Sequence, residues 1–492
     1  SMRSLRTATA TRLSNSSSSP YTHAHVDQIF AGFPSRLDLE QVLSEFRSAP
    51  AVPVRGGAES TLFLIGLERG SIRVASRMTD AESSTVAGRA AWRRQNRLAW
   101  YLWKALAAAP SASPTLLVAQ LDDISDEPVL GVPKFSSNGG GGDAWERCGH
   151  KIPVPILLKG FGSTDLAHRL AARAKEREGV RATAADSALA QLELPEASVP
   201  WALRSGVAAW RGSARSIVLS ETCVTVPLAR WADHPRGRLV ALSERHPQQV
   251  DAGYSELEKL PGGNESAVRT VGGLSWADMG KRKFLIEVDG HGYQASLAAK
   301  MMLRSAVLTQ ASGWRLWYEA LLRDGVHVVR VAPNLSNLLE RLAWLRCDDA
   351  RARAIGERGA RWIRRLLAEN SLVHYVTLIL RRYRTLFAPR AGAPPSLDAL
   401  FGVLCAGRTC KHYTAAAPPQ QFPKKAERAA KSDSLSSDAV IASCPTAHRG
   451  DGSVRECQRW CRAEDRRDHC TWCRCATCAF CAAGGAARTS KG

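Results

Sequence analysis

The sequence lacks several features that would place it in a common functional class. Its best apolar stretch, Val373–Leu380, ends at Arg381-Arg382, well short of the roughly eighteen residues that a membrane span requires. No Asp-x-Asp pair follows a predicted strand, where it could bind a metal ion. We find no nucleic-acid-binding module and no internal repeat of fixed period. These residues therefore predict no membrane span and no nucleic-acid partner.

Acidic residues are also scarce relative to basic ones. The chain has 46 Asp and Glu against 67 Lys and Arg, a net charge of +21. The excess is spread along the chain instead of forming a stripe. Diffuse positive charge suits anionic substrates such as nucleotide sugars, acidic glycans or a membrane surface. An Arg-rich composition without functional meaning explains it equally well.

Cysteine is sparse except near the C-terminus. Eight of the 13 cysteines lie between Cys444 and Cys481, in a segment too short to bury a core of its own. Its Cys-x2-Cys spacings are those of zinc ligands, and eight cysteines could equally form four disulfides. Trp460 and Trp472 are either stacking platforms for a glycan or protein, or the filling of a small core.

The first half of the chain predicts a mixture of helices and strands. Residues 1–20 are rich in Ser and Thr, and we expect them to be disordered. Apolar spacing and turn residues predict a helix over 26–46, a hairpin over 61–76 with its turn at Arg69-Gly70, a helix over 89–108, a strand over 116–121 and a flexible loop at 139–142.

In the second half of the chain, predicted strands and helices alternate more regularly. Such alternation predicts a parallel sheet with crossover helices, whose ligands lie at the carboxyl ends of the strands. After residue 388, Ala, Pro, Ser and Lys predict a linker over 389–440, within which 397–403 has the composition to dock. The predicted elements are strands over 283–288, 306–309 and 327–331, helices over 295–304 and 314–322, a helix from about 334, and helical structure over 348–387.

The strand over 283–288 ends in Asp289-Gly290-His291-Gly292. A glycine-rich turn between a strand and a helix lets backbone N–H groups approach a phosphate. Taken alone, two glycines indicate only a turn.

Several further segments occur in a fixed order around this turn, and together they resemble the Rumi-like protein O-glucosyltransferases, glycosyltransferase family 90. The resemblance covers about residues 60–387, densely from 205 onward. It rests on the Asp-Gly-x-Gly block with Ser305-Ala-Val-Leu, on Trp210-Arg-Gly-Ser213, Pro235-Arg236 to Ser243, Val250-Asp-Ala252, Trp314 to Leu322, Val326 to Val331, Asn334 to Leu338 and Ala354 to Ala360.

The resemblance implies a GT-B fold, an α/β architecture of two Rossmann-like domains facing a cleft, with the nucleotide sugar in the C-terminal domain and no metal. Basic side chains and helix N-termini would then neutralise the departing diphosphate, and Arg211 and Arg236 are our candidates. Either arginine could also be an ordinary surface residue. The nucleotide-sugar-binding residues expected on this basis are Arg211, Gly212, Ser213, Arg236, Asp278, Gly290, Gly292, Ser296 and Lys300.

The sequence departs from the family pattern after the glycine turn. Many relatives carry Ser and then Arg where this chain has Gln294 and Ser296, and a Lys where it has Ala298. We expect Lys300, one helical turn after Ser296, to replace the missing arginine. Weak donor binding, or none, is the alternative.

Inverting transfer to a hydroxyl needs a carboxylate that accepts the proton of the acceptor. The family places this base in an Asp-x-Pro turn after a strand, and Asp126-Glu127-Pro128 is similar. We therefore predict Asp126 as the catalytic base, with Asp123 in reserve. An Asp before x-Pro also forms turns with no catalytic role.

The sequence thus predicts an inverting, metal-independent transferase that moves glucose or xylose from a UDP-sugar to a protein or glycan hydroxyl. The alternatives are a catalytically impaired relative that binds glycan or protein, and a zinc-dependent nucleic-acid binder suggested only by charge and Cys-x2-Cys.

We expect no cofactor, with zinc in the Cys-rich module as the minority case, a monomer, and disulfides formed in the ER or Golgi lumen. Ser1-Met2 resembles a tag remnant, so we expect that a native leader or anchor was removed. The expected divisions are 1–20, an acceptor-side domain at 21–200, a nucleotide-sugar domain at 201–388, the linker at 389–440 and the Cys-rich module at 441–485.

Overall fold

The computed structural model divides the chain into two units, Ser1–Lys424 and Lys425–Gly492. The residues it describes all belong to the first unit, so the predicted Cys-rich module lies outside them. They are residues 19–31, 33, 37–49, 53–54, 58–59, 62–68, 70–78, 80–83, 86–108, 114–120, 133–136, 139–140, 151–154, 199–214, 217–218, 225–226, 228–257, 270–290, 294, 296–387, 396–406 and 408–419.

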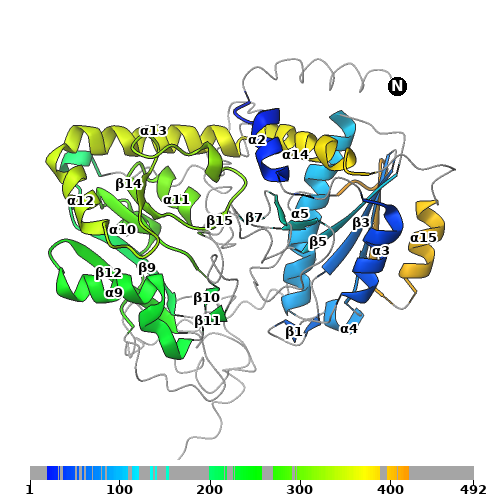
Figure 1. Cartoon of the computed structure of the whole chain (residues 1–492), viewed down its shortest axis with the longest axis horizontal. Coiled ribbons are helices and arrows are strands. Elements are labelled where there is room, and N and C mark those ends of the chain that lie inside the picture. The colour runs from blue at the N-terminus through cyan, green and yellow to red at the C-terminus, as the bar shows by residue number, and fades with distance from the viewer. Residues whose placement is uncertain are drawn as a thin grey trace, which may run out of the picture. The chain divides into compact units, whose positions relative to one another are not determined.

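A five-stranded, fully parallel sheet forms in the second half of this unit (Figure 1). Its strand order is β12-β9-β13-β14-β16, and each neighbouring pair runs in the same direction. The alternation of strands and helices predicted such a sheet, and the structure confirms it. The strands are β9 (Ala208–Ala214), β12 (Val250–Leu257), β13 (Phe284–Glu287), β14 (Ala306–Gln310) and β16 (Val329–Val331).

Both faces of the parallel sheet are covered. Phe284 and Ile286 of β13 pack in one core with Leu239, whereas Leu285 between them packs in the other core with Ile363. Burial on both faces explains why Phe284–Ile286 of β13 and Ala306–Leu308 of β14 are continuous apolar runs. The helices of this region are α9 (Pro235–Arg245), α10 (Trp276–Met279), α11 (Leu297–Met302), α12 (Leu338–Cys347) and α13 (Asp349–Leu367).

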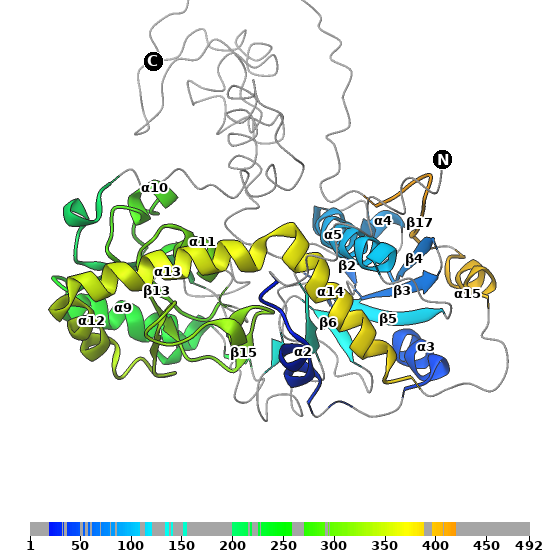
Figure 2. The same cartoon turned by 90° about the horizontal axis from the view of Figure 1, so that it is seen from above.

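A second, mixed sheet has six strands in the order β17-β4-β3-β5-β6-β8 (Figure 2). The predicted hairpin is confirmed: β3 and β4 pair antiparallel, and Gly70 in their turn has φ +69°, a conformation that glycine adopts without strain. Strands β5, β6 and β8 run parallel. The strands are β3 (Leu62–Glu68), β4 (Ser71–Ser76), β5 (Thr115–Gln120), β6 (Lys134–Ser136), β8 (Lys151–Pro153) and β17 (Cys410–Thr414).

Helix α14 (Glu369–Arg384) leaves the parallel sheet and packs in the region of the mixed sheet. The hydroxyl of Tyr375 donates to the carbonyl of Pro153 at 2.6 Å, and that of Tyr383 to the carbonyl of Leu116 at 3.1 Å. The helical structure predicted over 348–387 is confirmed, with a break at Ala368 between α13 and α14. By its contacts α14 belongs with the mixed sheet, although we predicted it inside the nucleotide-sugar domain at 201–388.

The helix predicted over 26–46 is two helices, α2 (His23–Phe30) and α3 (Leu39–Ser48). Each has its own N-cap: Thr22 accepts from the backbone N–H of His25, and Asp38 from that of Gln41. The helix predicted over 89–108 is confirmed as α5 (Val86–Ala108). No helix among the described residues is both long and apolar enough to cross a membrane. The remaining elements are β1 (Pro53–Val54), β2 (Ala58–Glu59), α4 (Asp80–Ser83), β10 (Ile217–Val218), β11 (Thr225–Val226) and two 3-10 turns, Trp201–Leu203 and Leu228–Asp233.

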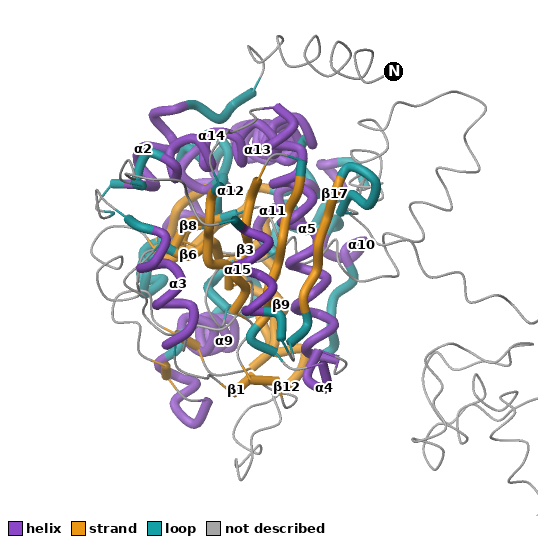
Figure 3. Tube along the Cα trace, turned by 90° about the vertical axis from the view of Figure 1, so that its right-hand side faces the viewer, coloured by secondary structure: helices purple, strands orange, loops and turns teal. Residues whose placement is uncertain are grey.

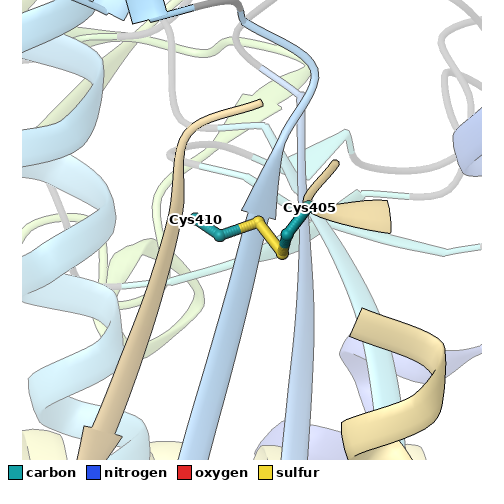
Figure 4. The surroundings of a disulfide bond; sticks show 2 residues. All are labelled: Cys405 and Cys410. Carbon is teal, nitrogen blue, oxygen red and sulfur yellow. A yellow bond between two sulfur atoms is a disulfide. The ribbon is translucent and has the colours of Figure 1, made fainter. Parts of the chain in front are cut away.

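Part of the predicted linker at 389–440 is folded, and the docking expected for 397–403 is confirmed. Helix α15 (Leu397–Leu404) lies on the same face of the mixed sheet as α3 (Figure 3). Phe401 is 2% exposed, and its ring occupies the space that a side chain at Gly66 of β3 would need. Strand β17 then pairs antiparallel with β4. A disulfide joins Cys405, after the helix, to Cys410 at the start of the strand (Figure 4).

Two further predictions, for residues 314–322 and for the glycines at 139–140, are wrong. Residues 314–322 form a short strand, β15 (Trp314–Arg315), and a 3-10 turn at Glu319–Leu321 instead of a helix. Trp314, Trp317 and Tyr318 are each 1% exposed, and burial on every side removes the amphipathic reason for a helix. The glycines at 139–140, predicted as a flexible loop, form β7 (Gly139–Gly140), which pairs antiparallel with β15. Figure 1 shows these two strands side by side.

Candidate functional site

Arg236 marks the carboxyl edge of the parallel sheet. It lies in the first turn of α9, directly after Pro235. Its Nε donates to the carbonyl of Asp289, after β13, at 2.9 Å, and its Nη1 to the carbonyl of Ser213, near the end of β9, at 2.7 Å. Its guanidinium also lies over the ring of Trp210, 5.6 Å from the centroid. Arg236 therefore joins two strand ends at the edge where parallel sheets bind their ligands.

Gly212 and Gly290 fit the same edge. The indole of Trp210 lies 2.6 Å from the position that a Cβ on Gly212 would take, so a side chain there would displace the ring under Arg236. Gly290 is buried directly after Asp289. Ser213 contributes its backbone carbonyl, as described for Arg236. The predicted residues Ser213, Arg236 and Gly290 are thus brought together.

Asp289 organises this edge. Its backbone N–H donates to the side-chain oxygen of Gln310 at 2.9 Å. Its carboxylate accepts from Ser312 Oγ at 2.6 Å and from Gln294 Nε2 at 3.2 Å. Gln294 in turn donates to the carbonyl of Gln310 at 2.8 Å and accepts from Thr309. Asp289 and Gln294 are 6% and 2% exposed, so these bonds fix the strand–helix turn in a buried network.

Sequence reasoning singled out the glycines and missed this polar network. Asp289, Gln310 and Ser312 were each visible as polar residues at the ends of β13 and β14. Their position at the carboxyl ends of apolar strands was the signal that could have found them.

Arg211 takes a different role from Arg236. Successive residues of a strand point to opposite faces, so Arg211 points away from Trp210 and Arg236. Its Nη2 forms an ion pair with Asp251 at 2.7 Å, and its Nε donates to the carbonyl of Gly272 at 3.0 Å. Arg282 binds the other oxygen of Asp251 at 2.9 Å. The structure does not bring Arg211 and Arg236 together as a pair.

Ser296 and Lys300 lie beneath the turn, in a cluster around Glu287. The hydroxyl of Ser296 lies 2.7 Å from Glu287 Oε2. The ammonium of Lys300 forms an ion pair with the same carboxylate and donates to the carbonyl of Ile286 at 2.7 Å. Lys300 is 1% exposed, and burial lowers its pKa against the opposing effect of Glu287. Lys300 therefore neutralises Glu287 inside the protein. We predicted instead that it would replace the missing arginine at the diphosphate.

Asp278 lies near the opposite edge of the sheet. It forms an ion pair with Lys281 at 2.7 Å and accepts from Ser275 Oγ at 2.6 Å. The hydrogen bonds from Lys281 and then from Ser275 lower its pKa to about 2. The carbonyl of Lys281 accepts from the N–H of Ser205, ahead of β9, which places this group at the amino ends of the strands. Asp278 is thus not brought to the edge that holds Arg236.

The predicted base lies outside the described residues, as do Asp123 and Gly292. Along the chain, Asp126 falls between β5 and β6, after the carboxyl end of β5. Strand β7 follows β6, and β15 follows β14, so the β7·β15 pairing joins chain that has just left the carboxyl ends of both sheets. Among the described residues, no group of three or more His, Cys, Asp or Glu side chains is arranged to hold a metal ion.

A parallel sheet with an arginine at a helix N-terminus and a glycine turn at its carboxyl edge is typical of α/β proteins that bind anionic ligands. Comparison with known proteins makes this class specific. Residues 179–427, half of the chain, match the family model described as glycosyl transferase family 90. The chain belongs to glycosyl transferase family 90, which confirms the resemblance found in its sequence.

Individual relatives match shorter stretches. Protein O-glucosyltransferase 3 of Rattus norvegicus is 31% identical over 154 residues, 30% of this chain and 29% of that protein. O-glucosyltransferase rumi of Drosophila pseudoobscura pseudoobscura is 26% identical over 197 residues, 39% of this chain and 44% of that protein. Uncharacterized protein 035R of Invertebrate iridescent virus 3 is 28% identical over 210 residues, 40% of this chain and 18% of that protein. The chain thus spans less than half the length of these curated relatives.

Proposed function

We propose that this protein is an inverting glycosyltransferase that moves glucose or xylose from a UDP-sugar to a hydroxyl of a protein or glycan acceptor, without a metal ion. Family membership and the names of the O-glucosyltransferase relatives support transfer of a sugar. The single observation that carries the proposal is Arg236 at the carboxyl edge of the parallel sheet, bonded to the ends of two strands. In this proposal the two sheets are the cores of a GT-B arrangement.

The diphosphate of the donor would lie against the start of α9. There Arg236 and the backbone N–H groups of the first helical turn supply positive charge, as a metal ion does in other transferases. As the bond between the anomeric carbon and the diphosphate breaks, negative charge grows on UDP, and Arg236 stabilises it. Arg236 is half-buried and already held by two carbonyls, so little reorganisation is needed.

Asp126 would act from the side of the mixed sheet. Its carboxylate takes the proton of the acceptor hydroxyl while that oxygen attacks the anomeric carbon from the face opposite UDP. One bond forms at the anomeric carbon as another breaks, so its configuration inverts. The β7·β15 pairing supports this geometry, because it joins chain leaving the carboxyl ends of both sheets.

The test is transfer by the full chain in the presence of excess chelator. UDP-glucose, UDP-xylose and UDP-galactose are supplied in turn with candidate acceptors, and released UDP and glycosylated product are measured. Arg236→Ala should lower UDP affinity, whereas Arg238→Ala, an exposed arginine of the same helix, should not. Asp126→Asn should abolish transfer and leave UDP binding intact. Activity that is lost on chelation and restored by manganese would contradict the metal-independent mechanism.

A specific observation favours a second candidate, a relative that binds its ligand without efficient turnover. At the turn before α11, Ser296 is uncharged and Lys300 is buried against Glu287, so neither brings a positive charge to the diphosphate. Calorimetry separates the two functions. Tight UDP binding without release of UDP from any of the three donors supports the binding protein.

We also propose that the protein works as a monomer in the lumen of the ER or Golgi. The Cys405–Cys410 disulfide supports an oxidising compartment, because such bonds persist there and are rare in the cytosol. On the same ground we propose disulfides over zinc for the eight cysteines from Cys444 to Cys481. Counting free thiols and bound zinc on the intact protein tests the oxidising compartment and the disulfides. Bound zinc with eight free thiols would contradict these two proposals.

A further inference from the structure

The β7·β15 pairing is too short to be stable alone. It consists of Trp314 opposite Gly140 and Arg315 opposite Gly139. Even a complete two-stranded hairpin is only marginally stable in water, and the glycines of β7 contribute no side chains to the contact. Something outside the pairing must hold β15 in place.

Ser312 makes that connection. Its hydroxyl donates to Asp289 Oδ2 at 2.6 Å and accepts from the backbone N–H of Trp314, the first residue of β15, at 2.9 Å. A hydroxyl has one proton to donate and lone pairs to accept with, so this one group serves both bonds at once. Trp314 is 1% exposed, which fixes the other side of the same residue in the core.

The other end of this chain of bonds is the proposed donor site. The carbonyl of Asp289 accepts from Arg236, and its N–H and carboxylate are bonded to Gln310, Gln294 and Ser312. A shift of the turn at Asp289 must therefore move or break the bond to Ser312. Hydrogen bonds run without interruption from Arg236 through Asp289 and Ser312 to Trp314.

We propose that Ser312 is a positioning residue, which couples the donor-side turn at Asp289 to the β7·β15 pairing between the two sheets. Through Ser312, an anion bound at Arg236 stabilises the strand pairing, and the pairing stabilises the bound anion by the same factor. The effect of a bound anion on the strand pairing rests on the proposed function. The effect of Ser312 on the pairing of β7 does not.

Hydrogen–deuterium exchange of the full chain tests the link without any ligand. Ser312→Ala should raise the exchange rate in peptides that cover Gly139-Gly140 about tenfold, the effect expected for one lost hydrogen bond. Ser312→Thr keeps the hydroxyl and should restore protection. The matched control is Ser336→Ala, because Ser336 is exposed and lies after the sheet's last strand. Unchanged exchange at Gly139-Gly140 in Ser312→Ala would overturn the proposal, whether or not the protein is a transferase.

The same peptides then report the coupling. In the wild type, saturating UDP should slow their exchange, and in Ser312→Ala the slowing should disappear. If Ser312→Ala fails to fold, Gly140→Pro breaks the pairing from its other side, and UDP affinity should fall by the factor by which UDP slowed exchange. An unchanged affinity in that variant would overturn the coupling. A wild type that binds no UDP would refute the proposed function, and the ligand-free exchange would still decide the role of Ser312.

Discussion

The two sheets of the molecule are assembled from different stretches of chain. The parallel sheet uses Ala208 to Val331 in a single pass, with each strand followed by its crossover. The mixed sheet takes five strands from residues 62–153 and a sixth, β17, from residues 410–414. A sheet built from neighbouring segments depends on local sequence, and one closed by a distant strand depends on a long-range contact. The two sheets should therefore respond differently to the loss of local and of distant contacts.

Removal of the distant strand should have the largest effect. A chain ending after Phe387 loses α15 and β17, and with them Leu397, Phe401 and Leu404, which are 1%, 2% and 6% exposed. Burial of three such side chains contributes about 5–9 kcal/mol, comparable to the whole stability of a typical domain. We therefore expect the mixed sheet to unfold, seen as rapid proteolysis within residues 62–154. A chain ending after Lys424 is the control, and equal resistance of both chains would show that β17 is dispensable.

In the parallel sheet, the buried pair of Glu287 and Lys300 should be the most sensitive point. Lys300→Met leaves the Glu287 carboxylate buried and unpaired, which costs about 3–5 kcal/mol in comparable sites. The free energy of unfolding in urea measures this loss. The double variant Glu287→Gln, Lys300→Met should recover most of it. If Lys300→Met is as stable as the wild type but binds UDP more weakly, Lys300 contacts the donor, as the sequence predicted.

The contact of α2 with the residues after β15 should show a smaller effect that depends on pH. His25 lies buried with its Nε2 bonded to the carbonyl of Trp317 at 3.0 Å, and burial lowers its pKa below 6.5. The unfolded chain therefore binds this proton more tightly than the folded one. Stability from His25 is complete above about pH 6.5 and falls below it, by at most about 1.4 kcal/mol per pH unit.

His25→Gln keeps a side-chain donor and removes the titration. Melting curves of this variant and the wild type should differ in their pH dependence between about pH 6.5 and 5. The comparison between the two proteins is needed because burial also lowers the pKa of His327 and His374. Parallel curves would show that His25 does not titrate in this range.

The smallest effect is expected at the amino ends of the strands of the parallel sheet, opposite the edge that holds Arg236. Asp278 lies at the amino ends of the strands with 44% of its side chain exposed, so Asp278→Asn should change UDP affinity by less than about twofold. Calorimetry beside Arg236→Ala provides the contrast. A strong loss in Asp278→Asn would mean that the ligand extends to that edge.

The parallel sheet was predictable because each part of it leaves a local signal. Phe284 to Ile286 is an apolar run buried on both faces, and the polar residues after it mark the strand end. The order of motifs singled out Arg236, whose role in donor binding stays a prediction. The partners of Lys300 and Arg211 were not predictable, because a charged side chain gives the same sequence signal whether it meets a ligand or a buried carboxylate. Pairing of β17 with β4 was equally hidden, since it joins residues more than 300 positions apart.

The late position of β17 also has a consequence for synthesis on the ribosome. The edge of β4 has its partner only after Thr414 has left the exit tunnel, whereas β4 itself ends at Ser76. At about 5–20 residues per second, the nascent chain carries an open strand edge for about 17–70 seconds. Such an edge is a template for pairing with other chains. The protein should therefore depend on chaperones during translation more than its parallel sheet alone would require.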